Sequence, residues 1–326
     1  MEGRYNMTRM EIMTKINRMN TEAKGSILAL LYFVLKKENG FEIVLADIDA
    51  KLQEEVAVTW MKSLQEYLND EERDVISLSN ADNRKNAIYE YDLEEFTPLL
   101  TMIKSPITDE KRKFDFRNDN FDEIFGFIIE VGLANNNFSI FKKNYPISLI
   151  RKDNSFNLSR FGDSHRLMKI AEDIVKIGFQ IDFFMIDELL LICNLNVLEK
   201  YFGFHEVIKN EALKSISIID ESGLLEDSEP LKSSLENMSF ARKLIKITSG
   251  SQVIGKIPNN IIIKYTKTNP ILKGKFSYNH SGSKILLQTK KAKDYFIKLL
   301  NDDILISELT KNYYDSLAKD IIKAEV

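Results

Sequence analysis

The pattern of apolar and polar positions in the first hundred residues predicts a strand, a helix and a second strand. Residues 27–35 form an uninterrupted apolar run, which is typical of a buried strand. Between residues 47 and 68 the apolar side chains recur at three- and four-residue steps, at Val56, Trp60, Leu64 and Tyr67. This spacing places them on one face of a helix. Residues 75–78 match another short strand, so the pattern indicates an α/β unit over residues 25–100.

Two β-hairpins are predicted in the middle of the chain. The first joins apolar strands at 125–131 and 138–141 through an asparagine-rich turn. The second joins 181–186 to 189–194 and has its tip at Asp187-Glu188. The hairpins favour a sheet with antiparallel neighbours in this region.

Helical patterns dominate the remainder, at residues 197–219, 237–247, 259–267 and from Lys290 onward, with a further hairpin at 275–287. No internal repeat is present, which argues against a solenoid. The predicted fold class is therefore α+β, with a mixed α/β N-terminal unit followed by β-hairpins and a helix-rich basic C-terminal region. The polar stretch 104–120 is the expected linker between an N-terminal domain at 1–104 and a second domain at 121–326.

Composition favours a globular protein of a reducing cytoplasm. The chain has 326 residues, of which 44% are hydrophobic, and a single cysteine, Cys193, inside an apolar run. One cysteine cannot form a disulfide within the chain, so a small buried side chain is expected. The longest apolar run has nine residues, whereas a membrane span needs about 20, and the N-terminus lacks the plan of a secretory signal. Membrane association is therefore expected only through a partner.

The distribution of charge along the chain is more informative than the net charge of −4. Residues 1–236 carry 29 Lys and Arg against 42 Asp and Glu, whereas residues 237–293 carry 12 against none. A run of 57 residues without a carboxylate is unlike a mixed-charge solvated surface. We call residues 237–293 the basic segment and expect its surface to bind a polyanion.

A phosphate-binding loop inside the basic segment is the first candidate for this role. The stretch TSGSQVIGKIP at 248–258 has the G-x-x-x-x-G-K spacing of such loops. However, Ile257 replaces the hydroxyl residue that binds magnesium, Pro258 follows it, and the preceding residues have a helical rather than a strand pattern. We therefore expect no NTPase site here.

Phosphate contacts distributed over the basic segment are the stronger prediction. Arg242 and Lys246 share one helix face, and Lys264 and Lys267 share another. The full candidate set for DNA binding is Arg242, Lys243, Lys246, Lys256, Lys264, Lys267, Lys273, Lys275, Lys284, Lys290, Lys291 and Lys293. Aromatic surface between them is expected from Tyr265, Phe276 and Tyr278. Composition alone equally allows a basic face that docks on the acidic part of this chain or of a second copy, with a membrane surface as a further alternative.

Candidates for catalysis and for metal binding are weaker. His165, His205 and His280 have no metal-ligand spacing. Asp182, Asp187 and Glu188 could serve a metal-dependent nuclease only if the fold brought them together, and strand geometry with an exposed hairpin tip argues against this.

Three stretches resemble the KwaB-like family of the Kiwa anti-phage defence system. They are GFQIDFFMIDELLLICN at 178–194, NVLEKYFGFHEVIKNEA at 196–212 and residues 283–320, within a resemblance that covers roughly 100–322. It implies a cytoplasmic DNA-binding subunit that works with a membrane-spanning partner, KwaA, and interferes with phage DNA replication and expression. It supplies no catalytic motif, and the first hundred residues match least.

The resulting hypothesis is a homodimer that binds double-stranded DNA mainly through phosphates and performs no chemistry, with no cofactor or metal. Such binding should depend weakly on base sequence and steeply on salt. A nuclease and a protein-interaction scaffold remain as alternatives.

Overall fold

The chain forms two compact units. The computed structural model describes residues 8–22, 28–71, 73–81, 86–104, 110–133, 136–145, 149–150, 158–159, 168–169, 174–306 and 313–315. The first unit, which we call the sheet unit, comprises Met1–Ile76, Asn86–Tyr91 and Thr97–Phe202. The second, the helical unit, comprises Ser77–Lys85, Asp92–Phe96 and Gly203–Val326.

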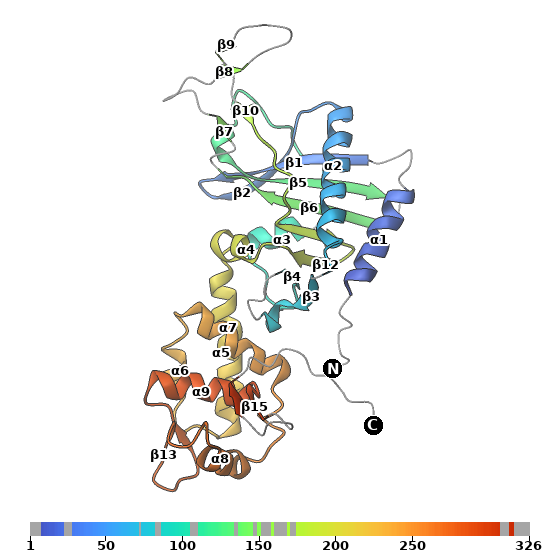
Figure 1. Ribbon diagram of the computed structural model, residues 1–326. Helices are drawn as coiled ribbons and strands as arrows, with labels where there is room; N and C mark the ends of the chain where they lie inside the picture. The colour runs from blue at the N-terminus through green and yellow to red at the C-terminus, as the bar shows by residue number, and fades with distance from the viewer. Residues whose placement is uncertain are drawn as a thin grey trace. The chain divides into compact units, whose positions relative to one another are not determined.

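An eight-stranded sheet organises the sheet unit (Figure 1). Its order is β2-β1-β5-β6-β11-β12-β4-β3, and the pairs from β2 to β4 are antiparallel. The strands are β1 Leu28–Lys37, β2 Gly40–Leu45, β3 Asp74–Ser77, β4 Ala87–Glu90, β5 Ile124–Leu133, β6 Asn136–Lys143, β11 Phe183–Ile186 and β12 Leu189–Ile192. Both central hairpins predicted from the sequence, β5–β6 and β11–β12, are confirmed. The sheet thus joins strands from both halves of the chain.

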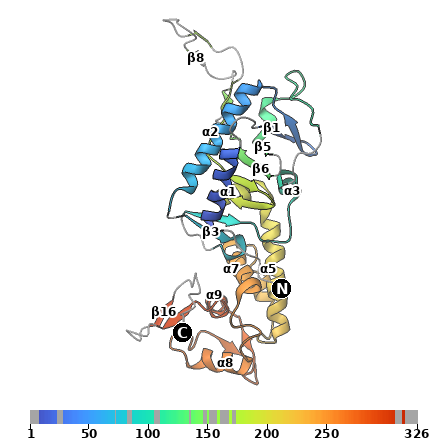
Figure 2. The same ribbon diagram turned by 90° about the vertical axis from the view of Figure 1, so that its right-hand side faces the viewer.

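Two helices, α1 Arg9–Glu22 and α2 Ala50–Leu68, cover one face of this sheet (Figures 1 and 2). The side chain of Asp49 caps α2 by accepting a hydrogen bond from the backbone N–H of Leu52 at 2.9 Å. The face of α2 predicted from its apolar spacing is buried, and Trp60 is fully buried. Burial of such a large aromatic side chain anchors the helix on the sheet.

An aromatic cluster packs on the face of the sheet opposite α1 and α2. Phe141 and Phe183 stack with ring centroids 5.5 Å apart, and Phe202, which follows α4, meets both rings edge-on. The alternation of side chains along a strand separates this cluster from the α1–α2 side, because successive residues point to opposite faces. The remaining helices of the unit are α3 Pro98–Lys104 and α4 Leu195–Tyr201, and its short strand pairs are β7 Leu149–Ile150 with β10 Ile174–Val175 and β8 Leu158–Ser159 with β9 Met168–Lys169.

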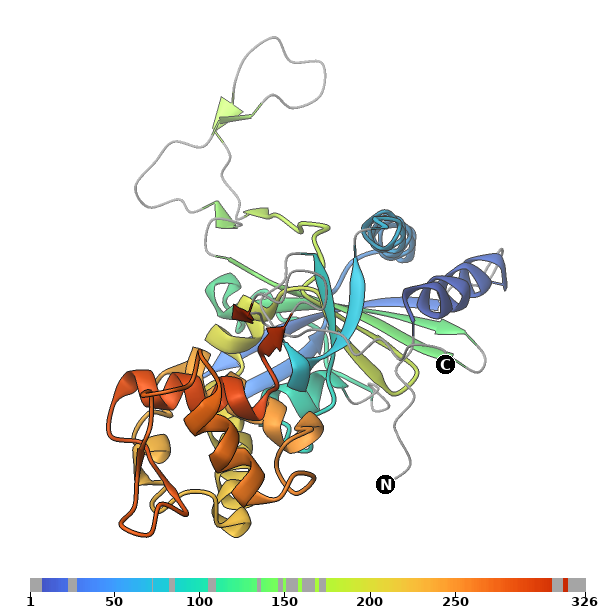
Figure 3. The same ribbon diagram turned by 60° about the horizontal axis from the view of Figure 1, so that its bottom comes forward.

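The helical unit is built around the long helix α5 (Figure 3). Gly203 and Gly223 flank α5, both with φ of 67°, a conformation that favours glycine. α5 packs against α7, and α7 packs against α9. The helices are α5 Phe204–Ser222, α6 Glu229–Lys232, α7 Met238–Gly250, α8 Asn259–Thr268 and α9 Lys290–Leu300, and the strand pairs are β13 Ser277–Tyr278 with β14 Ile285–Leu286 and β15 Ile304–Ile306 with β16 Tyr313–Asp315.

The segment Asp92–Phe96 belongs to the helical unit because of contacts with α5. Lys214 pairs with Glu94 at 3.1 Å, and the Asn210 amide donates to the Glu95 carboxylate at 2.9 Å. Residues before position 100 therefore contribute to both units, and the chain passes between them more than once.

The α+β class is confirmed, but the chain does not divide at the expected linker. Residues 110–120 pack on the sheet unit: Phe114 is 2% exposed in its core, and Arg112 pairs with Glu42 at 2.7 Å and with Asp119. Pairing of β1 with β5 places residues from both sides of residues 104–120 in one sheet. A charged stretch was interpreted as a linker, whereas its charges neutralise one another on the surface of a folded unit.

Candidate nucleic-acid interface

Helix α7 carries the first group of cations in the basic segment. Its cap, Asn237, accepts a hydrogen bond from the Phe240 N–H at 3.2 Å. Leu244 is fully buried, whereas Lys243 is exposed and Arg242 and Lys246 are half-buried. The predicted helix is confirmed, with its apolar face in the core of the helical unit.

The loop-like motif at 248–258 lies between two helices. Gly250 is the last residue of α7, and α8 begins at Asn259, so no strand leads into the motif and no helix starts directly after Lys256. The Lys256 ammonium donates instead to the Gln252 side chain at 2.9 Å. A phosphate loop needs a following helix N-terminus, and this stretch follows a helix C-terminus.

Helix α8 presents Lys264 and Lys267 to solvent, while Ile262, Ile263 and Thr266 are buried. The Lys267 ammonium donates to the Gly282 carbonyl at 3.0 Å and lies 4.5 Å from the centroid of the Tyr278 ring. Lys267 therefore connects α8 to the turn of the β13–β14 hairpin, while Lys264 forms no such contact with the described residues.

The hairpin and its flanks hold Lys273, Lys275 and Lys284. Lys273 is exposed, Lys275 lies over the Tyr295 ring at 5.5 Å, and Lys284 pairs with Glu226 at 3.5 Å. The aromatic surface predicted here is only partly present, because Phe276 is 8% exposed and belongs to the core. Tyr265 is 37% exposed and Tyr278 is half-buried. The expectation for Phe276 was wrong, since the short alternating stretch gave no indication of which face would be buried.

Helix α9 begins with the last three candidate lysines. Thr289 caps it by accepting from the Ala292 N–H at 3.1 Å. Lys290 and Lys291 are exposed, whereas Lys293 donates to the Ser234 hydroxyl at 2.6 Å and to the Pro230 carbonyl at 3.3 Å. Lys293 is thus positioned by its own unit, while Lys290 and Lys291 extend into solvent.

Most exposed cations of the basic segment have no carboxylate partner in the part of the chain that the structure describes. Seven lysines share this property: Lys243, Lys256, Lys264, Lys267, Lys273, Lys290 and Lys291. In the sheet unit some cations, such as Lys37, Arg112 and Lys142, form ion pairs, whereas exposed lysines such as Lys36 and Lys51 form none with the described residues. The basic segment therefore presents a largely uncompensated positive surface.

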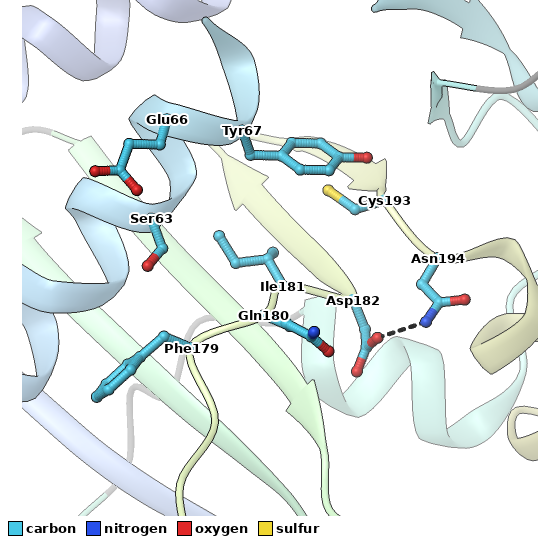
Figure 4. Close-up of a pocket in the computed structure, with 9 residues that line it drawn as sticks. All are labelled: Ser63, Glu66, Tyr67, Phe179, Gln180, Ile181, Asp182, Cys193 and Asn194. Atoms are coloured by element: carbon cyan, nitrogen blue, oxygen red, sulfur yellow. Dashed lines mark hydrogen bonds between the residues drawn. The ribbon is translucent and has the colours of Figure 1, made fainter. Parts of the chain in front are cut away.

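The acidic residues of the nuclease alternative do not converge. Asp182 is 1% exposed and accepts from the Asn194 side chain at 2.8 Å (Figure 4). It also accepts from the Lys143 N–H at 2.8 Å, and Lys142 lies 3.2 Å away. Asp187 stands at the exposed turn after β11 and pairs with Lys15. Five residues of extended chain span about 16 Å, whereas two ligands of one Mg²⁺ lie within about 5 Å of each other. No group of three or more His, Cys, Asp or Glu residues suited to a metal ion occurs among the described residues.

Two of the three histidines lie on the surface of the helical unit. His205 and His280 are both exposed, and His165 falls outside the described residues.

A cavity of about 560 Å³ adjoins Asp182 and is bordered by Tyr67, Phe179 and Cys193 (Figure 4). Cys193 is a free thiol that packs against the core of the sheet unit, as expected for a small apolar side chain. Burial raises its pKa well above the ordinary value, so the thiol stays protonated and unreactive at neutral pH. This environment favours a structural role for Cys193.

The sequence interpretation missed the buried lysine Lys143. It is 8% exposed, and its ammonium lies 4.3 Å from the centroid of the Phe125 ring and 5.0 Å from that of Tyr201. Burial lowers its pKa from 10.5 to about 8, although the negative charge of Asp182 opposes the shift. The sequence feature that could have indicated a buried lysine is the Lys142-Lys143 pair at the end of an otherwise apolar strand.

No helix in the described part of the chain is both long enough and apolar enough to cross a membrane.

Comparison with known proteins supports the resemblance seen in the sequence. The family model described as "Kiwa protein KwaB-like" matches residues 121–310. The chain is 33% identical over 283 residues to "Kiwa protein KwaB" of Escherichia coli O55:H7 (strain RM12579 / EPEC), an alignment that covers 86% of this chain and 90% of the relative. No protein of known structure matches the chain.

Proposed function

Because the chain belongs to the Kiwa protein KwaB-like family, we propose that it is a DNA-binding subunit of a Kiwa anti-phage defence system. In this proposal the basic segment binds double-stranded DNA through its phosphates, and the bound protein blocks replication and expression of phage DNA. The chain itself performs no chemistry and needs no cofactor.

The observation that carries this proposal is the set of seven exposed lysines without carboxylate partners. An uncompensated positive surface attracts the DNA backbone, and binding releases the counterions condensed on the phosphates. The lysines are distributed over α7, α8, α9 and the intervening loops rather than along one helix. This distribution suits contacts to backbone phosphates more than base reading by a single recognition helix.

The number of exposed lysines sets an upper limit on how steeply DNA affinity should fall with salt concentration. Each phosphate contact contributes about 0.9 to the slope of log K against log salt, so seven contacts would give a slope of up to about −6. Affinity should change little among duplexes of different sequence, because phosphates carry no sequence information.

A salt series measured by fluorescence polarisation tests the proposal. We would compare the wild type with a variant in which Lys256, Lys264, Lys273 and Lys291 are changed to Gln. The loss of four contacts should weaken binding and reduce the magnitude of the slope by up to about 3.6. All four side chains are exposed, so the changes should not disturb folding.

A matched variant controls for the change in net charge. It carries Gln in place of Lys36, Lys51, Lys176 and Lys200, which are exposed lysines of the sheet unit. Its salt slope should equal that of the wild type. Equal weakening in both variants would show that net charge alone matters, and absence of wild-type binding at physiological salt would refute DNA binding.

A protein-interaction scaffold is the second candidate, favoured by an exposed apolar stripe next to the cations. Ile257, which precedes α8, and Ile261 and Tyr265 within α8 recur every four residues and are 38%, 53% and 37% exposed. Such a stripe is typical of a helix face that contacts another protein. A scaffold would bind its partner with loss of exposure at Ile261 and show no affinity for DNA.

We further propose that the subunit is a cytoplasmic homodimer recruited to the inner face of the cell membrane by the transmembrane partner KwaA. Membership of the family supports both associations, and the exposed Ile261 and Tyr265 of α8 offer an apolar contact surface. Mass photometry of the purified chain and co-purification with KwaA from membranes test the two associations separately.

A further inference from the structure

A cavity of about 310 Å³ opens in the helical unit where α7 and α9 begin. Asn237 and Ser239 at the start of α7 border it, together with Lys290 at the start of α9. Its volume lies at the lower end of the range of about 300–1,000 Å³ for small-molecule sites. The cavity therefore has room for a mononucleotide or for the end of a DNA strand, but not for a duplex.

Three ammonium groups line this cavity. Lys293 is held in place by its hydrogen bonds to the Ser234 hydroxyl and the Pro230 carbonyl, at 2.6 and 3.3 Å. Lys243 and Lys290 line the same space and have no carboxylate partner in the described part of the chain. The site thus combines one lysine held by hydrogen bonds with two exposed lysines.

Two helix N-termini add to the positive potential. The caps Asn237 and Thr289 accept from the N–H groups of Phe240 and Ala292, at 3.2 and 3.1 Å. The earlier amides of each first turn have no partner within their helix. Each helix end behaves as roughly half a positive charge, which favours an anion nearby.

The negative groups around the cavity do not cancel this charge. Glu236 forms an ion pair at 3.0 Å with Lys209, a lysine that does not line the cavity. Asp294 is the other carboxylate in the lining. Three lysines and two helix ends face Asp294, which forms no ion pair with the residues that the structure describes. The resulting excess of positive charge matches a dianion better than a monoanion.

We propose that this cavity binds a terminal phosphate monoester, carried either by a free nucleotide or by the end of a DNA strand. A monoester carries nearly two negative charges at neutral pH because its second pKa is about 6, whereas a phosphodiester within DNA carries one. The inference goes beyond duplex binding by the exposed lysines. It requires a defined site rather than a diffuse surface.

Isothermal titration of the full chain with deoxyadenosine monophosphate tests the site, with deoxyadenosine as the ligand lacking phosphate. Lys243→Gln combined with Lys290→Gln should weaken nucleotide binding by about tenfold or more, because each removed contact is a hydrogen bond to a charged group. Lys36→Gln combined with Lys51→Gln removes the same charge from exposed lysines of the sheet unit and should leave nucleotide binding unchanged. Binding should also weaken as the pH falls below about 6, where the monoester loses its second charge.

The two phosphate sources are separated by blunt duplexes with and without a 5′-phosphate. Preference for the phosphorylated duplex assigns the site to DNA ends, and nucleotide binding without such a preference assigns it to free nucleotides. Equal binding of deoxyadenosine, equal affinity in the two double variants, or binding of neither nucleotide nor end phosphate would overturn the proposal. Salt-dependent duplex binding can survive each of these results, so failure of the cavity and failure of the proposed function are distinguishable.

Discussion

The buried ammonium of Lys143 predicts an unusual dependence of stability on pH. The pKa of this group is lowered from 10.5 to about 8 by burial among Phe125, Tyr145 and Tyr201. A tenfold change in proton affinity corresponds to about 1.4 kcal/mol, so keeping the charge in the folded sheet unit costs roughly 3 kcal/mol. The pKa of Lys143 is lower in the folded state than in the unfolded state. Burial of Lys143 therefore costs nothing above the unfolded pKa, and the cost reaches its full size as the pH falls through the folded pKa.

Between about pH 8 and pH 10 the unfolding free energy should consequently rise by about 2 kcal/mol from this group alone. Deprotonation of tyrosines acts in the opposite direction at higher pH. Burial raises the pKa of Tyr32 to about 12, so its contribution is lost as the pH rises above 10.0. Burial also raises the pKa of the Cys193 thiol from 9.0, so Cys193 lowers the unfolding free energy within this range, and the lysine is isolated by the difference between the wild type and a variant that lacks Lys143.

Urea unfolding followed by Trp60 fluorescence provides the assay, because Trp60 is the single tryptophan of the chain and is fully buried in the sheet unit. Relative to the wild type, Lys143→Met should lack the gain of about 2 kcal/mol between pH 8 and pH 10, and Lys62→Met, at an exposed lysine of α2, should retain it. Parallel curves for the wild type and Lys143→Met would refute the reasoning, since they would mean that the ammonium is solvated with an ordinary pKa.

Two further predictions concern the same unit and the same assay. Asp182→Asn leaves a buried lysine without its partner and should destabilise the unit by about 3–5 kcal/mol, whereas Asp187→Asn at the exposed turn should cost less than about 1 kcal/mol; similar losses would contradict the burial of Asp182. Gly126→Ala would place its Cβ 2.6 Å from the Phe141 ring and should cost about 1–3 kcal/mol, whereas Gly178→Ala meets nothing within 4 Å and should be neutral. A neutral result at both glycines would show that the sheet relaxes around the added methyl group.

Local patterns predicted the elements well, because periodicity is a property of neighbouring residues. The helix around Trp60 and the hairpin with its tip at Asp187 both match their sequence signals. Long-range pairing left no such trace: nothing in residues 27–35 indicates that β1 pairs with β5, about a hundred residues later. Phe114 shows the same limit, since a lone aromatic residue among charges gave no sign of the core that it enters.

The candidate interface was predictable in its charge but not in its geometry. Counting carboxylates located the basic segment, and the structure places seven of its lysines in solvent. The meeting of Lys243 with Lys290 and Lys293 depends on the packing of α7 against α9, which spacing along the chain does not encode. The buried pair of Lys142 and Asp182 was missed for the same reason, because their sequence separation of 40 residues conceals the contact.

The order of strands in the sheet determines where this chain can be cut. A fragment beginning at Phe121 keeps β5, β6, β11 and β12, which are adjacent in the middle of the sheet, and loses β2 and β1 from one side and β4 and β3 from the other. Both outer strands of the remainder would present unsatisfied backbone N–H and C=O groups, and such edges pair with other copies. The first hundred residues, which lie outside the stretch that the family model matches, therefore protect its sheet from aggregation, and expression of the later part alone should yield insoluble protein.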